Sequence, residues 1–271
     1  MLPAVPIYNS AGIFIMPFTF SHPAAVLPFC RSKKIPVSVT GLIVGSLVPD
    51  FEFLFLLRES DYLGHFWPGI ILINIPAAIL VSFIFHYLVR NALILHLPQF
   101  LQQRFSPLLS FNWGVYFKKH VTGFIIGVLV GVVLHVGIDA FTHRDGAVAR
   151  QFAFFQVKEN VTGYGLPVYF MLQLLTSLIG AFYIIWFVLR LKKEKSLHYA
   201  GRPFLYWLLV VLFTLVILAV RFTAFRQYNS SEDIIIAIVG SPLYALLAVS
   251  LIFYKQIRQQ LVASQVEKLS A

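Results

Sequence analysis

Acidic and imidazole side chains stand inside stretches that are otherwise apolar, and they are the residues of this chain best suited to chemistry. A charged side chain at the centre of a bilayer costs roughly 2.5–3.5 kcal/mol on insertion scales, so each one needs a partner or a function. The acidic residues of this kind are Asp50, Glu52 and Asp139. His135 precedes Asp139 by four residues, and residues four apart are neighbours on a helix surface. The pair therefore presents an imidazole and a carboxylate on one face of a helix.

The same helix face carries a longer repeat with a period of four residues. Its members are Gly123, Gly127, Gly131, His135, Asp139 and His143. The glycine half permits close approach of another helix, and the other half offers imidazole, carboxylate and imidazole. A second glycine pair, Gly41 and Gly45, comes shortly before Pro49-Asp50. Both segments are therefore suited to close approach by another helix.

Composition identifies the setting as a membrane. Of 271 residues, 59% are hydrophobic and only 12% are charged, and the mean hydropathy is +0.81. A soluble domain is about 45–50% apolar and about 25% charged, so polar surface is too scarce here for a water-soluble globule. Basic residues sit at the ends of apolar runs, which is typical of helix anchors at lipid headgroups rather than of nucleic-acid binding. With Cys30 as the single cysteine, no intramolecular disulfide can form.

Six stretches are long and apolar enough to span a bilayer, which takes about 20 residues. They are residues 35–57, 66–89, 120–139, 168–190, 203–220 and 234–254. Of the 21 Lys and Arg residues in the loops and terminal segments, fifteen fall on one side of the membrane and six on the other. The basic side is expected to be cytoplasmic, which places both termini in the cytoplasm.

The predicted fold class is all-α, a polytopic transmembrane helix bundle of about six spans. Residues 1–15 are expected to be an N-terminal extension, 16–260 a single membrane domain and 261–271 a cytoplasmic tail. The apolar stretch from Ile13 to Cys30 is interrupted by Pro17, Pro23 and Pro28. Because proline bends a helix and removes a donor, we expect an interfacial or re-entrant segment there, with a seventh span as the alternative.

The candidate residues fall at similar depths in this topology. Asp50 and His135 each lie 15 residues into a span, about 22 Å from the inner boundary. Asp139 lies about one turn further out, and His65 directly precedes the second span at the same outer edge. We therefore expect these four side chains to converge near the extracytoplasmic face.

Imidazoles and carboxylates are ligands of zinc, and also of manganese or iron. A divalent metal in such a site would polarise a phosphoryl or carbonyl oxygen. Glu52 would orient the ligands or act as a base, and Arg58 and Arg144 would hold an anionic substrate group. The simpler alternative is a hydrogen-bonded His135–Asp139 pair that fixes helix packing.

The motifs around these residues carry a resemblance to a known family. They are Met16-Pro-Phe-Thr-Phe-Ser-His-Pro-Ala-Ala-Val-Leu-Pro28, Gly45-Ser-Leu-Val-Pro-Asp-Phe-Glu52, Gly64-His65 with Pro68-Gly69, and Leu134-His-Val-Gly-Ile-Asp-Ala-Phe-Thr-His143. From Met16 to about Leu189 the chain resembles the bacterial membrane-protein family called domain of unknown function 4184. The pattern is similar to that of inner-membrane metal-dependent hydrolases, which resemble zinc-dependent phospholipase C. That resemblance implies metal ligands at His22, Asp50, His65, His135 and Asp139.

Two features depart from the hydrolase pattern. Those hydrolases have a His-Arg-Gly-x-Thr-His run, whereas this chain has a single histidine at the corresponding place, His65, which implies one metal or none. In addition, the topology from charge puts His22 on the inner side, so it reaches the site only if residues 13–30 re-enter the membrane.

Together, these residues and the resemblance imply a metal-dependent hydrolase in the bacterial inner membrane, acting on a lipid-linked or phosphoester substrate near the extracytoplasmic face. The expected partners are the lipid bilayer and a lipid or lipid-linked substrate, without nucleic acid. Two alternatives remain: a transporter or channel with an intramembrane Asp/His relay, and a non-enzymatic membrane scaffold.

Overall fold

The protein is built almost entirely from helices. Its computed structural model describes residues 19–30, 36–60, 63–159, 166–194 and 201–270. The α-helices, in chain order, are α1 (Pro23–Cys30), α2 (Val39–Gly45), α3 (Phe51–Leu56), α4 (Ile75–Ile84), α5 (Arg90–His96), α6 (Gln99–Phe105), α7 (Trp113–Lys119), α8 (Val121–Thr142), α9 (Ala153–Gln156), α10 (Val168–Leu189), α11 (Pro203–Ala224) and α12 (Ser231–Ser270). The shorter 3₁₀ and π segments are η1 (Thr19–Ser21), η2 (Val48–Asp50), η3 (Leu63–His65), η4 (Ile70–Asn74), η5 (Phe85–Val89) and η6 (Ser106–Ser110). The described strands are a two-residue antiparallel pair, β1 (Lys158–Glu159) and β2 (Leu166–Pro167).

Five described helical segments are long and apolar enough to cross a membrane. They are Ile70–His96, Val121–Thr142, Val168–Leu189, Pro203–Ala224 and Ser231–Val262. A sixth candidate is the pair α2 and η2–α3, which is bent by 43°. These segments coincide with the six stretches predicted from hydropathy, and the all-α membrane bundle is confirmed.

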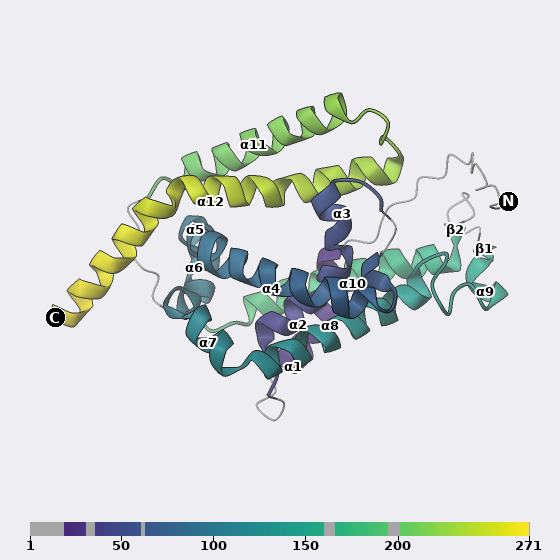
Figure 1. Ribbon diagram of the computed structural model, residues 1–271, viewed down its shortest axis with the longest axis horizontal. Helices are drawn as coiled ribbons and strands as arrows, with labels where there is room; N and C mark the ends of the chain where they lie inside the picture. The colour runs from purple at the N-terminus through teal and green to yellow at the C-terminus, as the bar shows by residue number, and fades with distance from the viewer. Residues whose placement is uncertain (1–18, 31–35, 61–62, 160–165, 195–200, 271) are drawn as a thin grey trace.

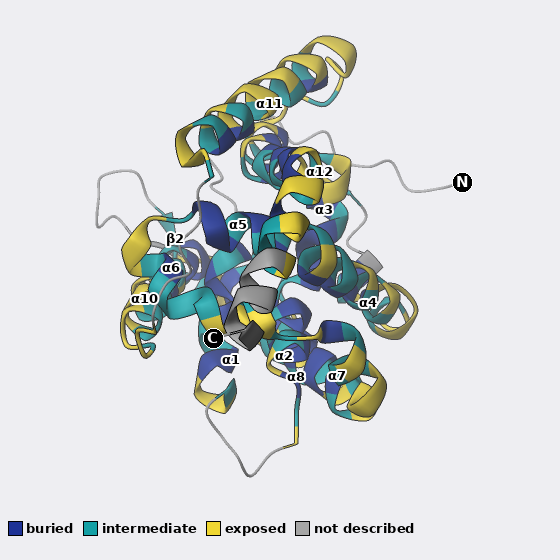
Figure 2. Ribbon diagram, turned by 90° about the vertical axis from the view of Figure 1, so that its left-hand side faces the viewer, coloured by how far each residue is buried: buried dark blue, intermediate teal, exposed yellow. Residues whose placement is uncertain are grey.

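The outer faces of the spans are apolar, as a lipid environment requires. In Figure 2 exposed residues follow the outer sides of α10 and α11. They include Phe182, which is 69% exposed, and Val216, which is 61% exposed. Since large apolar groups on the outside of long helices favour contact with acyl chains over water, the protein is a multi-pass membrane protein.

The first span is broken rather than continuous. A regular helix over residues 35–57 was expected, but α2 ends at Gly45 and the chain turns through η2 before α3 begins. Pro49 lies in this turn and has no N–H to donate to the carbonyl four residues earlier. The break keeps Asp50 inside the bundle, where it is 5% exposed.

Helices α2 and α8 pack against each other along their glycines. A Cβ placed on Gly45 would collide with the backbone of Val128, and one on Gly131 would meet the Leu42 carbonyl and the amide nitrogen of Ser46. The two helices run in the same direction, because Ser38 N–H donates to the Gly123 carbonyl at one end and His135 contacts Ser46 at the other. The backbones of the two helices therefore touch directly, and no larger side chain fits between them at these glycines.

Helix α1 packs inside the bundle, against α2, α8 and α10. Its Val26 is fully buried, and a Cβ on Gly180 of α10 would lie 2.9 Å from the Ser21 carbonyl oxygen. With eight residues, α1 is about 12 Å long and covers less than half of the hydrocarbon thickness. Helix α1 is therefore too short to cross the membrane by itself. Residues 13–18 of the predicted re-entrant segment, and the extension 1–15, lie outside the described residues.

The last two long helices form a hairpin along one side of the bundle (Figure 1). Helix α12 contacts α11, α3, η5 and α5. A second buried apolar cluster, which includes Tyr206, Val210 and Phe253, joins α11 to α12 and α5. The hairpin therefore covers α3, which follows the break in the first span, and the second half of the second span.

Candidate metal centre

Four of the predicted side chains meet in one buried group. Asp50 comes from η2, His65 from η3, and His135 and Asp139 from α8. One ligand atom from each residue lies within 4.8 Å of the corresponding atoms of the others. The convergence predicted from matching depths is therefore present.

The spacing of the group is regular. The atoms are Asp50 Oδ1, Asp139 Oδ2 and the Nε2 atoms of His65 and His135. Five of their six separations run from 3.0 to 3.5 Å: His135–Asp139 3.0 Å, His135–His65 3.3 Å, His135–Asp50 3.4 Å, His65–Asp139 3.4 Å and His65–Asp50 3.5 Å. A tetrahedron centred about 2.0–2.2 Å from each vertex, the length of zinc–nitrogen and zinc–oxygen bonds, has edges of about 3.3–3.6 Å. The residues present fit one such ion.

Helix α8 and the broken first span together orient His135. The imidazole is fully buried, and its Nδ1 lies 2.8 Å from the carbonyl oxygen of Ser46. Because a carbonyl only accepts, Nδ1 donates, and in the neutral ring the lone pair of Nε2 faces the two carboxylates. Lone pairs that face one another at these distances repel, so a cation or protons must lie between them.

Asp50 is held at its other oxygen. The hydroxyl of Thr19, at the start of η1, donates to Asp50 Oδ2 at 2.7 Å. That bond fixes the carboxylate so that Oδ1 points toward His135 and His65. A threonine from the N-terminal segment thus supports a candidate ligand 31 residues later in the chain.

His65 is placed by a short turn that lies close to the break. A Cβ on Gly64 would lie 2.9 Å from the Pro49 carbonyl oxygen, so a larger residue would push the turn away. Asn74, at the end of the π segment η4, is fully buried and donates from Nδ2 to the Gly64 carbonyl at 2.8 Å. Single π turns inside helices are frequent at functional sites. Here the π turn brings the side-chain amide of Asn74 to the turn that carries His65.

His22 reaches the group, contrary to the topology that placed it on the inner side. Its Nε2 lies 3.2 Å from Asp139 Oδ1, and its ring stacks on that of His135 with centroids 4.1 Å apart. The carbonyl of Thr19 lies 3.1 Å from Nδ1. The charge count failed for His22 because it assigns sides only to loops between complete spans, whereas η1 and α1 lie within the bundle.

His143 is a further member that the site prediction left out. Its Nδ1 lies 3.3 Å from Asp139 Oδ1, the oxygen that His22 also faces. The repeat with a period of four residues contains His143 and was the signal for it. Thr19 had no comparable signal, while Asn74 was detectable as an amide inside an apolar run.

The remaining predicted residues lie outside the four-residue group. Glu52 is half-buried on α3. The guanidinium of Arg58 stacks on Tyr228 at 4.5 Å and donates to the Glu59 carbonyl. Arg144 is exposed, directly after His143. Their catalytic and substrate-binding roles stay predictions.

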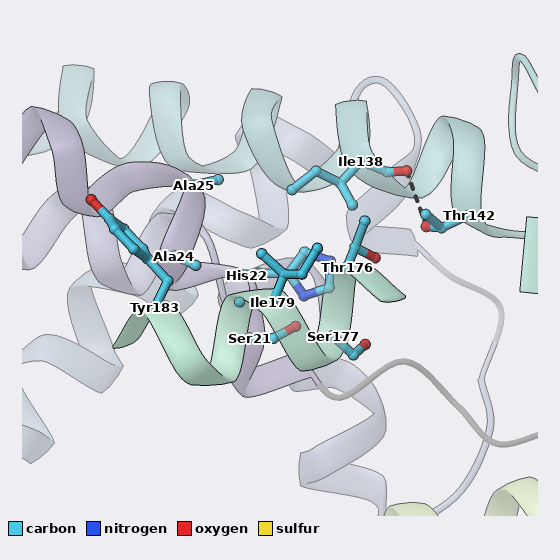
Figure 3. Close-up of a pocket in the computed structure, with 11 residues that line it drawn as sticks. Ser21, His22, Ala24, Ala25, Ile138, Thr142, Thr176, Ser177, Ile179 and Tyr183 are labelled. Carbon is cyan, nitrogen blue, oxygen red and sulfur yellow. Dashed lines mark hydrogen bonds between the residues drawn. The ribbon is translucent and has the colours of Figure 1, made fainter. Parts of the chain in front are cut away.

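A pocket of about 280 Å³ adjoins the group through His22. It lies between η1–α1, α8 and α10, and most of its wall is apolar, including Ile138 and Ile179. Figure 3 shows these side chains around it, with Tyr183 and Thr142 at opposite ends. The described residues do not enclose the group completely, because the side chains of His65 and His143 are 14% and 28% exposed.

Comparison with known proteins gives a family. The family model described as "Domain of unknown function (DUF4184)" matches residues 16–257. No curated protein and no solved structure matches the chain. Because the match covers most of the sequence, including every residue of the four-residue group, the chain belongs to the DUF4184 family.

Proposed function

We propose that this protein is a metal-dependent hydrolase that acts on a lipid-linked or phosphoester substrate within the bacterial inner membrane. One observation carries the proposal: two carboxylates and two imidazoles, mostly buried and with ligand atoms within 4.8 Å of one another, surround a position that suits a divalent cation. In the predicted topology, with both termini cytoplasmic, this position lies near the extracytoplasmic face.

The metal ligands in this proposal are Asp50, His65, His135 and Asp139, with His22 as a fifth ligand or as a donor to Asp139. Zinc suits the donor set, and manganese or iron also fits. When bound, the cation would polarise a phosphoryl or carbonyl oxygen and activate a water molecule.

The remaining chemistry belongs to residues around the ligands. Glu52, two residues after Asp50, is proposed as the base or as a group that orients the ligands, and Asp50 is the other proposed catalytic carboxylate. Arg58 and Arg144 are proposed to bind the anionic part of the substrate. Thr19 and the Ser46 carbonyl keep the ligands oriented through the hydrogen bonds described above.

The apolar pocket beside His22 supports a substrate with a lipid tail. Acyl chains favour an apolar wall, and the pocket offers one between α1, α8 and α10, next to Asp139. The partly exposed side of His65 and His143 supplies water for hydrolysis. Substrate and water therefore have different routes to the same group.

Metal analysis of the full chain, purified in mild detergent, tests the proposal. We expect about one transition-metal ion per chain in the wild type, and less than about a tenth of that in Asp50→Asn and Asp139→Asn. Asp145→Asn is the matched control, because Asp145 is an exposed carboxylate close to the site along the chain. It is expected to retain the wild-type metal content.

Hydrolysis is then assayed on bis(4-nitrophenyl) phosphate and on phosphatidylglycerol vesicles. Activity that requires the metal and disappears in Asp139→Asn supports the enzyme. Wild-type protein without stoichiometric metal would overturn the metal centre. Bound metal without hydrolysis of either probe would overturn the phosphoesterase, and Asp139-dependent ion flux in proteoliposomes would then assign the group to transport.

A further inference from the structure

A second pocket, with a more polar wall than the first, lies at the opposite end of the bundle from the metal centre. It has a volume of about 470 Å³ and is enclosed by η5–α5, η6, the start of α7 and the later part of α12. Trp113, in its wall, packs on Phe124 with ring centroids 5.6 Å apart. Phe124 precedes His135 by 11 residues on α8, which is about 16 Å. The two sites are therefore separate.

The pocket contains a buried arginine. Arg90 is 5% exposed and donates to the Phe111 carbonyl at 2.8 Å and to Asn91 Oδ1 at 2.9 Å. Among the described residues, no carboxylate forms a salt bridge with it. A buried guanidinium without an anionic partner is costly in a membrane, and an anion bound beside it would lower that free-energy cost.

The histidine beside it does not add a second charge. Arg90 Nη1 lies 3.2 Å from His86 Nδ1, and since arginine only donates, Nδ1 accepts. The proton of the neutral ring then sits on Nε2, 3.1 Å from the Thr40 hydroxyl oxygen. His86 also stacks on Trp113 with centroids 4.4 Å apart. The ring thus holds the guanidinium in place and leaves one buried positive charge.

Two more features of the wall suit an anion. The indole Nε1–H of Trp113 is buried without a hydrogen-bond partner among the described residues. Arg258, on α12, lines the rim and is exposed. None of the described residues that line the pocket is acidic. The described lining therefore supplies hydrogen-bond donors and positive charge and no negative charge of its own.

The other wall of the pocket is apolar. It includes Leu109 of η6 and Ile257 and Leu261 of α12. We propose that this pocket binds the phosphodiester of a phospholipid from the leaflet on the basic side of the membrane. The single buried charge of Arg90 matches the single charge of a phosphodiester, and the apolar wall contacts the acyl chains. In the predicted topology this leaflet is the cytoplasmic one.

Native mass spectrometry of the detergent-purified full chain tests the site with three probes. Dioleoyl phosphatidylglycerol carries both phosphate and acyl chains, dioleoylglycerol lacks the phosphate, and inorganic phosphate lacks the chains. We expect the wild type to bind phosphatidylglycerol at least about tenfold more tightly than either of the other two, since it alone offers both the charged acceptor and the acyl chains. Equal binding of dioleoylglycerol would overturn the phosphate site, and equal binding of inorganic phosphate would overturn the lipid as its ligand.

The arginine variants test the residues. Arg90→Gln is expected to weaken phosphatidylglycerol binding about tenfold and Arg258→Gln about threefold. Arg150→Gln, an exposed arginine at the other end of the bundle, is expected to bind as the wild type does. Unchanged binding in a folded Arg90→Gln would overturn the proposal. If Arg90→Gln does not fold, Arg258→Gln is the deciding variant. Equal phosphatidylglycerol binding by Arg258→Gln and Arg150→Gln would then overturn the proposal.

Discussion

His135 donates from Nδ1 to the carbonyl oxygen of Ser46 across the contact between α8 and the first span, at 2.8 Å. In a continuous helix this carbonyl would accept from the amide of Asp50, four residues later. Here the Asp50 amide donates to the Leu47 carbonyl instead. The break in the span therefore frees the acceptor that orients His135, and it also turns Asp50 toward the same ring.

The glycine contact between α2 and α8 is predicted to be necessary for stability. Gly131→Ala would place a Cβ 2.5 Å from the Leu42 carbonyl oxygen and 2.6 Å from the Ser46 nitrogen. We expect a loss of about 1–3 kcal/mol in the free energy of unfolding, measured in detergent. On the same helix, Gly137 has no atom within 4 Å of its Cβ position, so Gly137→Ala should be neutral or stabilising by up to about 1 kcal/mol. Equal effects of the two substitutions would contradict this packing.

Thr19 is predicted to tune metal affinity through Asp50. Thr19→Val keeps the shape and removes the hydroxyl that donates to Asp50 Oδ2. Groups that orient a ligand typically contribute 10–100-fold to affinity, so we expect zinc affinity to fall by about that factor in a competition assay with a chelator. Thr19→Ser retains the donor and should stay within about threefold of the wild type. A normal affinity in Thr19→Val would mean that Asp50 is not a ligand.

Asn74 is predicted to position His65. Asn74→Leu removes the hydrogen bond to the Gly64 carbonyl, and we expect a loss of about 1–3 kcal/mol in stability together with weaker metal binding. Asn112→Ala provides the comparison. It removes the N-cap of α7, away from the site, and should cost about 0.5–2 kcal/mol while metal affinity stays unchanged. If both variants bind metal equally well, the turn does not depend on Asn74.

Glu59, in the connection after α3, is predicted to make stability depend on pH. Partial burial, with Glu232 and Asp233 nearby, raises its pKa above the ordinary value of 4.5. An acid with a raised pKa in the folded state favours folding when protonated and opposes it when ionised. Glu59→Gln should therefore raise Tm relative to the wild type at pH 7.5, and the difference should vanish as the pH falls through about 4.5. A constant difference between pH 4 and 7.5 would rule out this effect.

Hydropathy and spacing predicted the long helices and the core of the site well. Each of the long spans can be recognised because the length of an apolar run is read directly from the local sequence. The pair His135 and Asp139 follows from helical periodicity alone. Equal depth then brought Asp50 and His65 into the same prediction, because depth depends only on distance along a span.

Features that depend on contacts between distant segments could not be predicted this way. The carbonyl of Ser46 is free to accept from His135 only because the turn at Pro49 interrupts the helix. Hydropathy does not detect such a break in an apolar run. Thr19 is an ordinary polar residue until η1 comes to lie beside Asp50. His22 was implied by the family resemblance and not by the charge pattern, since a short buried helix such as α1 follows no loop-charge rule.

The distance in sequence between His22 and Asp139, 117 residues, has a consequence for biosynthesis. At about 5–20 residues per second, the ribosome needs roughly 6–23 s to add Asp139 after His22. During that interval Thr19, His22, Asp50 and His65 are synthesised before α8 exists to complete their surroundings. The early segments must therefore tolerate an Asp50 without His135, and the centre closes only when the glycine face of the third long apolar segment meets the first.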